Sequence, residues 1–453
     1  MVIAEPTDLY LSWGRYHRYR HRIIVPATID AAARAVAEAP APLLPFGLGR
    51  SYGDTCLNQD GTLIDTRRLD RFFDFDRETG LLVCEAGVSL GDLLDITAAP
   101  LPDGSHWFVP VSPGTRFVTV AGAIANDVHG KNHFRQGTFG RHVRWFDLAR
   151  SDGVVRCSAE AHQDLFEATI GGLGLTGLIL RAAVQLIRVP SLTLEVEEIA
   201  MDDLDDYYRL RDESLADWDY CAAWVDVLAR GRSLGRGIYT RARHASGAGP
   251  ATAPARRGGP AVPVDAPAWL LNRFSLRAFN ALYARKLLGR RQVRRSAGYE
   301  GIFYPLDSIR HWNRLYGRPG FHQYQCVVPA AGEGQAVAAL LGRIAASGQG
   351  SFLAVLKSFG ALASPGLLSF PMHGTTLALD FPNRGARTLD LLDALDEIVA
   401  AAGGRVYPAK DGRMSGAMFS AGFPRLDRFK ASIDPKFSSS FWRRTAAIAD
   451  SDR

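Results

Sequence analysis

Three stretches of small residues lie in the first 180 residues of this 453-residue chain, and they limit the folds it can adopt. They read LPFGLGRSYGDTCLN (44–58), SPGTRFVTVAGAIANDVHGKNHFRQGTFG (112–140) and ATIGGLGLTGLIL (168–180). Glycine has no Cβ and allows positive φ, so backbone or ligand can approach closely. One such stretch is either a tight turn after a strand or a phosphate-binding loop. Three together predict a dinucleotide bound along main chain. None is a G-x-G-x-x-G motif that opens a helix after a first strand, so a Rossmann NAD site is disfavoured.

Composition excludes several classes of protein. Hydrophobic residues make up 47% and charged residues 22%, as in ordinary globular proteins. No apolar run reaches the roughly 18 residues of a membrane helix, and the N-terminus has no apolar signal core. We therefore expect a soluble, cytoplasmic protein, with contact at a membrane or the cell envelope left open. The net charge of +6 fits an anionic ligand or lipid headgroup rather than nucleic acid. Five cysteines without C-x-x-C spacing argue against a disulfide framework and a zinc site, and we predict no metal.

The chain is too long for a single hydrophobic core, and its organisation changes near Ser191. Short β-like runs and glycine turns precede this point, and a strand followed by an acidic amphipathic helix comes after it. Residues 241–269 are dense in Gly, Ala and Pro, which predicts a mobile loop or linker. The basic run RKLLGRRQVRR (285–295) predicts a solvated helix face, or else a docking face for an anionic partner or lipid surface.

The motifs as a set resemble the FAD-linked oxidases of the vanillyl-alcohol oxidase superfamily. GLGRSYGD, VPVSPGTRFVTVAGAIANDVHGKNH, GGLGLTG, FHQYQCVVP and AKDGR follow one another as in the decaprenylphosphoryl-ribose oxidases, the flavin enzymes of a two-enzyme ribose 2′-epimerase. The resemblance implies an α+β fold with two domains. Residues 1–190 would form a PCMH-type FAD-binding domain, 191–404 an antiparallel-sheet substrate or cap domain, and 405–453 a segment that returns to the first domain.

The resemblance also implies which residues contact FAD. The segment 47–53 would hold the pyrophosphate, and 113–130 would line the isoalloxazine. Several members of the superfamily bind flavin covalently through a histidine in the first loop; Arg50 stands there in this chain, which implies non-covalent FAD. The residues expected at the cofactor are Gly47, Leu48, Gly49, Arg50, Ser51, Tyr52, Pro113, Gly114, Thr115, Thr119, Gly122, Ala123, Asn126, His129, Gly130, Gly174, Ile179 and Tyr407.

Two residues are predicted to be catalytic. The resemblance places His129 beside the flavin, where it would orient the substrate or assist proton transfer, and its acid or base role stays open. Lys410 would stabilise the charge that develops during reduction, although a surface lysine paired with Asp411 is the ordinary alternative. The residues expected at the substrate are Tyr52, Lys131, Gln323, Gln325, Lys357, Thr376 and Lys410.

The residue patterns give some of these assignments separate support. Gln323 and Gln325 share one face of a strand, and buried amides must find partners. Lys357 lies within an apolar strand, where a charge needs a partner such as a substrate phosphate.

Thr376 and Ala378 stand where the oxidases that the chain resembles carry asparagine and cysteine, which implies a reshaped pocket.

The reaction that the resemblance implies is oxidation of a secondary hydroxyl of a phosphoribosyl-type sugar to a ketone, the first half of a 2′-epimerisation. A separate NADH-dependent short-chain reductase would complete it, and no nucleic-acid partner is expected. One alternative is an alditol or aldonolactone oxidase that uses O2 and releases H2O2. Another is a flavin-free binding or scaffold protein.

Overall fold

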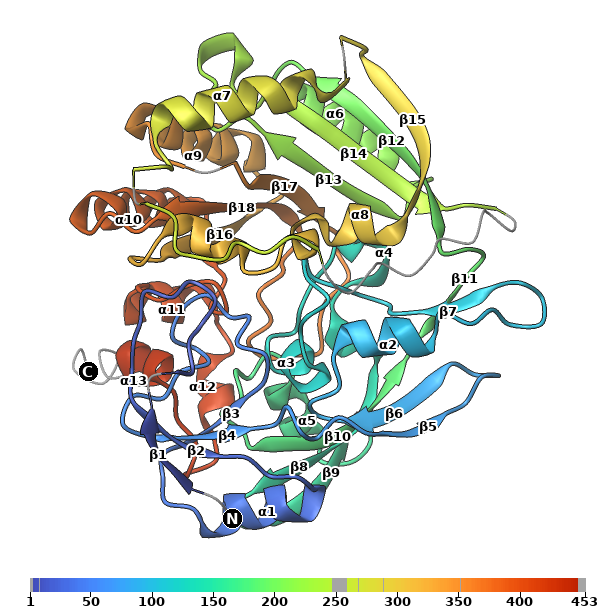
Figure 1. Cartoon of the computed structure of the whole chain (residues 1–453), viewed down its shortest axis with the longest axis vertical. Coiled ribbons are helices and arrows are strands. Elements are labelled where there is room, and N and C mark those ends of the chain that lie inside the picture. Colours follow the sequence, from blue (N-terminus) through green and yellow to red (C-terminus); the bar gives the residue numbers. More distant parts are fainter. Residues whose placement is uncertain are drawn as a thin grey trace.

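The computed structural model describes residues 3–7, 9–246, 259–267, 269–287, 289–350 and 352–446 (Figure 1). Helices and mostly antiparallel sheets are mixed along the chain, and the predicted α+β class is confirmed. Within these ranges, no helix combines the length and the apolar character needed to cross a bilayer. The cytoplasmic location stays a prediction.

Two sheets form the lower part of the molecule in Figure 1. A four-stranded sheet has the order β1 (Ile3–Thr7), β2 (His21–Ile24), β4 (Thr62–Asp65), β3 (Leu43–Phe46). A five-stranded antiparallel sheet has the order β5 (Phe72–Phe75), β6 (Leu81–Glu85), β10 (Leu178–Gln185), β8 (Val143–Arg150), β9 (Gly153–Ser158). Helix α1 (Ile29–Glu38) starts at Thr28, whose hydroxyl accepts a hydrogen bond from the N–H of Ala31 (3.2 Å). Its apolar face packs in the same core as Leu178 and Leu180 of β10, which joins the two sheets.

The upper part is an eight-stranded antiparallel sheet. Its order is β15 (Gln292–Gly298), β12 (Thr193–Met201), β14 (Gly237–His244), β13 (Tyr220–Val225), β17 (Ala354–Phe359), β18 (Gly374–Pro382), β16 (Phe321–Pro329), β19 (Arg405–Val406). Helices α6 (Leu204–Ser214), α9 (Glu333–Ser347) and α10 (Ala386–Ala401) pack on this sheet. A two-stranded sheet pairs β7 (His106–Phe108) with β11 (Ile187–Val189), the strand that directly precedes β12 in the chain.

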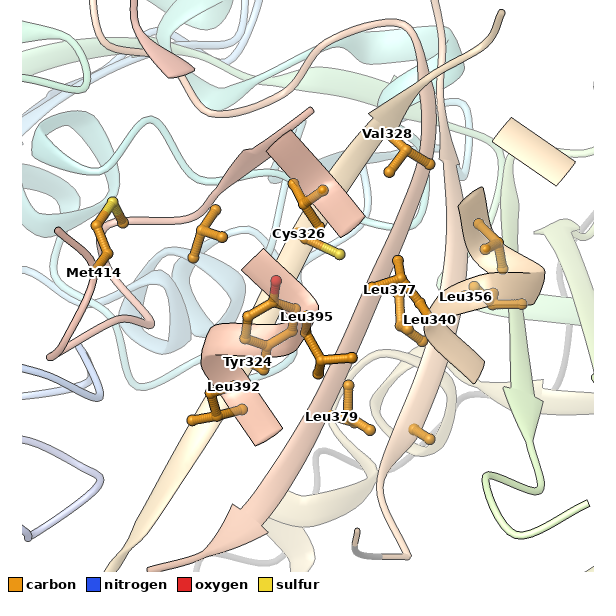
Figure 2. Close-up of a cluster of buried hydrophobic side chains, with 14 of the residues drawn as sticks. Tyr324, Cys326, Val328, Leu340, Leu356, Leu377, Leu379, Leu392, Leu395 and Met414 are labelled. Atoms are coloured by element: carbon orange, nitrogen blue, oxygen red, sulfur yellow. The ribbon is translucent and has the colours of Figure 1, made fainter. Parts of the chain in front are cut away.

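Side chains alternate in direction along the central strands, and this alternation decides which of them contact the helices. Tyr324, Cys326 and Val328 of β16 point into the apolar cluster with Leu340 of α9 and Leu395 of α10 (Figure 2). Successive residues of a strand face opposite sides of a sheet. The polar residues between them therefore face away from the helices, toward the small-residue stretches of the N-terminal half.

Short helices complete the fold. They are α2 (Leu90–Ile96), α3 (Val120–Ala125), α4 (His133–Gln136), α5 (Gln163–Thr169), α7 (Arg273–Ala284), α8 (Tyr299–Phe303), α11 (Gly416–Gly422), α12 (Leu426–Lys430) and α13 (Ser440–Ala446). After α12 the chain contacts the four-stranded sheet, where the N–H of Leu43 donates to the carbonyl of Lys436 (2.7 Å). The division of the chain at residues 190 and 404 stays a prediction.

The structure corrects part of the loop prediction for residues 241–269. Residues 241–244 belong to β14 and pair with β12. Residues 247–258 and 268 lie outside the described residues. Between them, Asp265 forms an ion pair with Arg15 (2.6 Å), and the N–H of Arg310 donates to the carbonyl of Pro260 (2.8 Å). Glycine and proline content did not reveal these long-range partners.

The basic run is also not one helix face. Residues 285–287 form a short 3-10 turn, and β15 begins at Gln292. The reason is charge pairing across strands, because Arg294 binds Glu197 of β12 and Arg295 lies 3.5 Å from Glu198. Opposite charges that face one another stabilise adjacent strands, and this contact is invisible in the local sequence.

Candidate active site

One large cavity brings the three small-residue stretches together with the polar face of the eight-stranded sheet. Its volume is about 670 Å³, within the roughly 300–1,000 Å³ range of small-molecule and cofactor sites. Its walls also include most residues of the segment 301–312, which begins inside α8 and continues toward β16. The structure therefore joins segments that are up to 397 positions apart in sequence, from Trp13 to Lys410.

The first stretch forms a loop after β3, and some of its backbone N–H groups are unpaired within the described chain. Gly49 has φ +60°, which places it in the left-handed region. The backbone N–H groups of residues 48–51 donate to no acceptor within the described chain. Consecutive free N–H groups around a left-handed residue form a concave site for anions. This donor set fits the pyrophosphate of a dinucleotide.

Arg50 lies at the edge of this loop and is held by aromatic rings. Its guanidinium lies 4.1 Å from the ring centre of Trp13 and 5.6 Å from that of Phe117. Burial lowers the pKa of Arg50, and the nearby carboxylate of Asp307 opposes that shift. Asp307 is itself fixed, because one of its oxygens accepts from the N–H of Arg116 (2.9 Å).

Glycines in these stretches serve two purposes. A Cβ on Gly114 would meet no atom within 4 Å, so this backbone lies open to the cavity. A Cβ on Gly47 would lie 2.7 Å from Oγ1 of Thr119, the hydroxyl that caps α3. A Cβ on Gly53 would overlap the carbonyl of Asp411, so Gly53 is required for packing of the two segments rather than for contact with a ligand.

His129 is positioned by the turn at Asp127. Asp127 has φ +39° and is completely buried. Its carboxylate accepts hydrogen bonds from the N–H of Gly140 (2.8 Å) and from the hydroxyls of Ser364 (2.5 Å) and Ser369. These bonds stabilise an unfavourable backbone conformation two residues before His129.

A hydrogen-bond chain sets the tautomer of His129. The hydroxyl of Thr376 donates to the carbonyl of Cys326 (2.7 Å), so its oxygen accepts from the amide of Gln325 (3.3 Å). The second N–H of that amide donates to Nε2 of His129 (2.8 Å). A neutral imidazole that accepts at Nε2 carries its proton at Nδ1. Nδ1 is buried and has no hydrogen-bond partner among the described residues, so this N–H is an unsatisfied donor.

Electrostatics keep His129 neutral. Burial, and then the charges of Lys357, His133 and Lys410, hold the pKa of His129 well below its usual value. At neutral pH the imidazole is therefore a hydrogen-bond donor at Nδ1 and not an acid.

Three partly buried lysines gather around the same end of the cavity. Desolvation lowers the pKa of Lys131 to about 8, and desolvation together with neighbouring lysines lowers the pKa of Lys357 to about 7. Desolvation also lowers the pKa of Lys410 to about 7, although the charge of Asp380 opposes the shift. Lys410 lies 3.9 Å from the ring centre of Tyr52. None of the three forms an ion pair within the part of the chain that the structure describes, and this excludes the alternative of Lys410 paired with Asp411.

The lysines leave the cavity with an excess of positive charge. Asp380, the carboxylate whose charge acts on Lys410, is completely buried and accepts from Gln323 (2.7 Å) and the hydroxyl of Tyr316 (3.0 Å). Burial raises the pKa of Asp380 to about 7, which reduces its negative charge further. A site of this kind favours an anionic ligand.

The cavity walls include all but two of the residues expected at the cofactor or the substrate. Ala123 lies instead in the apolar core under α3, and Thr376 lies behind Gln325. Both expectations of direct ligand contact are corrected. Thr376 is completely buried, so it acts through Gln325. The contacts of the other predicted residues with ligands stay predictions.

The sequence did not reveal several residues of the walls. They include Trp13, Phe117, Glu198, Lys286, Arg295, Asp307 and Trp312. Only Phe117 belongs to one of the three small-residue stretches, and Lys286 and Arg295 belong to the basic run. No pattern marked the others. The ion pair of Lys286 with Glu198 (2.5 Å) occurs only because β12 lies beside this segment in the fold.

Comparison with known proteins places this site in a family. A model of the FAD binding domain matches residues 21–158. Decaprenylphosphoryl-β-D-ribose oxidase of Mycolicibacterium smegmatis is 37% identical over 92% of both chains. The chain belongs to the FAD-linked oxidase family that includes this enzyme. A Streptomyces coelicolor protein from the mprA 5′ region is 39% identical over 75% of this chain and 95% of its own. L-Gulonolactone oxidase of Mus musculus is 28% identical over 36% of this chain and 37% of its own.

Membership of the FAD-linked oxidase family confirms the predicted cofactor and class of enzyme. The protein is an FAD-dependent oxidoreductase, and the alternative of a flavin-free scaffold is wrong. The free N–H groups of residues 48–51 and the open backbone at Gly114 fit FAD on structural grounds. Non-covalent attachment stays a prediction from the arginine at position 50.

Proposed function

We propose that the protein oxidises a secondary hydroxyl of a ribosyl-type sugar with an anionic, phosphoryl substituent to a ketone. The observation that supports this most directly is the group of three lysines without carboxylate partners beside His129. The Mycolicibacterium relative is a decaprenylphosphoryl-β-D-ribose oxidase by name, in agreement with such a substrate.

The chain's residues divide between cofactor and substrate. The N–H groups of residues 48–51 and Arg50 would hold the FAD pyrophosphate, and the open backbone at Gly114 would lie against the cofactor. FAD supplies the acceptor for the hydride that leaves the carbinol carbon. Lys131 and Lys357 would bind the phosphoryl group, because its negative charge supplies the counter-charge that neither lysine has within the described part of the chain.

Proton transfer is assigned to the lysines rather than to His129. His129 accepts from Gln325 at Nε2, so it would orient the substrate by donating its Nδ1–H to a sugar oxygen. Lys357 would be held charged by the phosphoryl group, whereas Lys410 has a pKa of about 7 and is readily neutral at neutral pH. The neutral amine would take the hydroxyl proton and become charged. The charged amines would then stabilise the negative charge that develops.

Anaerobic reduction of the bound flavin tests this proposal. A short-chain alkyl phosphodiester of ribose should bleach the flavin absorbance, whereas the matching alkyl riboside without phosphate, xylitol and an aldonolactone should act much more slowly. Lys357→Met should slow reduction by the phosphodiester and leave that by the riboside nearly unchanged. Equal or faster reduction by xylitol or the lactone, with H2O2 released in air, would contradict the proposal and support the alditol or aldonolactone alternative.

We also propose that this reaction is the first half of a 2′-epimerisation. Oxidation alone leaves a ketone, and inversion requires hydride return to the opposite face by a separate NADH-dependent short-chain reductase. The test is to supply the oxidised sugar to such a reductase and determine the configuration at C2′. Return of the starting configuration only would exclude epimerisation.

A further inference from the structure

Helix α7 has two different faces. Leu276 and Asn280 are buried, and the amide of Asn280 donates to Asp226 (2.5 Å). Tyr283 packs on the same side, with its ring centre 4.6 Å from that of Trp224. The inner face is thus firmly attached to the eight-stranded sheet. In Figure 1 the helix runs along the outer edge of the molecule.

The outer face exposes large apolar side chains. Phe274 is 65% exposed and Leu282 73% exposed, and Ala278 lies between them at the same helical spacing. Trp269, which precedes the helix, is 73% exposed, and Leu270 is also exposed. Exposed apolar residues gathered on one element, in contrast to scattered ones, mark an interaction site.

The same face is strongly basic. Between Asp265 and Glu300 the chain has eight basic residues and no acidic residue. Four of these, on or beside β15 and α7, bind carboxylates of β12 or the turn after it. The other four are exposed and have no ion pair within the described chain: Arg273, Arg277, Arg285 and Arg290. Their charge therefore remains available to a partner.

We propose that this surface docks on an anionic lipid bilayer. The surface, called here the α7 surface, comprises Trp269, Leu270, Arg273, Phe274, Arg277, Leu282 and Arg285. Trp, Phe and Leu beside Arg are the composition of a helix that lies in the membrane interface, with its apolar face among the acyl chains and its cations at the headgroups. An acidic protein or a polynucleotide would match the charges but would leave the apolar side chains without a partner.

Docking would bring the active site to the membrane. Tyr283 and Lys286 line the cavity from the inner side of the same segment, and Arg295 of the adjacent strand does so too. A sugar carried on a lipid could therefore reach the lysines without leaving the bilayer surface. The docking surface does not depend on this substrate, because its residues lie outside the cavity walls.

Vesicle co-flotation of the FAD-loaded, full-length protein tests the proposal. Vesicles of phosphatidylcholine with 30% phosphatidylglycerol, about one third anionic lipid, should bind the protein, and pure phosphatidylcholine vesicles should bind it far less. Arg273→Gln with Arg277→Gln should weaken binding about 25-fold, since each basic residue near an anionic surface contributes about fivefold. Phe274→Ser with Leu282→Ser should abolish salt-resistant binding.

Matched controls separate docking from general charge or hydrophobicity. Phe73→Ser with Val154→Ser removes exposed apolar residues from β5 and β9 at the other end of the molecule, and Arg34→Gln with Arg68→Gln removes exposed charge there. Both should leave vesicle binding unchanged. All variants should keep the flavin spectrum and the wild-type rate of reduction by a soluble substrate. No binding of the wild type, equal loss in the controls, or preferential binding to polyglutamate or DNA would overturn the proposal, whatever the outcome of the flavin-reduction test.

Discussion

The proposed role of Lys357 predicts that substrate binding is coupled to proton uptake. With a pKa of about 7, Lys357 carries its proton in about one tenth of the molecules at pH 8 and in about nine tenths at pH 6. A bound phosphodiester would raise this pKa toward the ordinary lysine value, because it supplies the missing counter-charge. Binding should therefore take up about 0.9 proton through Lys357 at pH 8 and about 0.1 proton at pH 6.

The direction of the pH dependence follows from the same shift. Because the free protein binds fewer protons at this site than the complex, affinity falls as the pH rises above 7. The loss should approach tenfold, about 1.4 kcal/mol, for each pH unit between pH 7 and the raised pKa of the complex. Below about pH 6 the affinity should level off, because the amine is already charged.

Calorimetric titration measures both quantities. The FAD-loaded protein is titrated with an alkyl phosphodiester of 2-deoxyribose in buffers of different ionisation enthalpy. This ligand lacks the hydroxyl that would be oxidised and does not itself titrate between pH 6 and 9. Lys357→Met should abolish most of the proton uptake at pH 8. Lys430→Met, which removes a lysine of α12 outside the cavity, should not change it. Tight binding at pH 8 without proton uptake, or the same uptake in Lys357→Met, would refute the reasoning.

Three further outcomes are expected. Thr376→Val removes two hydrogen bonds and should lower the free energy of unfolding in urea by about 1–3 kcal/mol while slowing flavin reduction, and Thr376→Ser should restore both; normal reduction by the valine variant would show that the hydroxyl does not position the site. Gly53→Ala should lower the thermal unfolding temperature strongly because its Cβ would overlap Asp411, whereas Gly342→Ala on α9, where a Cβ meets nothing within 4 Å, should not. Acid denaturation should release all flavin into the supernatant, since Arg50 cannot form a histidyl bond; a yellow precipitate would contradict this.

Local sequence was sufficient for the cofactor half of the site. Gly49 supplies the left-handed backbone of the first loop and Gly114 leaves main chain open to the cavity, and both constraints act on the residue itself. The loops therefore predict a dinucleotide site before any fold is known. Lys357 was equally visible, because a charge inside an apolar strand demands a partner.

The substrate half was decided by tertiary structure. Whether Thr376 touches a ligand or supports Gln325 depends on which strand pairs with β18 and in which register, and alternation along β18 alone does not fix its neighbour. Asp307 enters the cavity wall because the N–H of Arg116, 191 positions away in sequence, binds its carboxylate. Hydrogen bonds and ion pairs of this kind join residues that only the packed chain brings within a few ångströms.

The basic segment between Asp265 and Glu300 shows what the sequence determines and what the fold determines. Its composition, eight cations and no carboxylate between Asp265 and Glu300, is fixed by the sequence and determines its affinity for anions. Which of those cations are neutralised by β12, and which stay exposed beside Phe274 and Leu282, depends on strand pairing and on the face that α7 turns inward. Charge is a property of the residues, but its availability to a partner is a property of the fold.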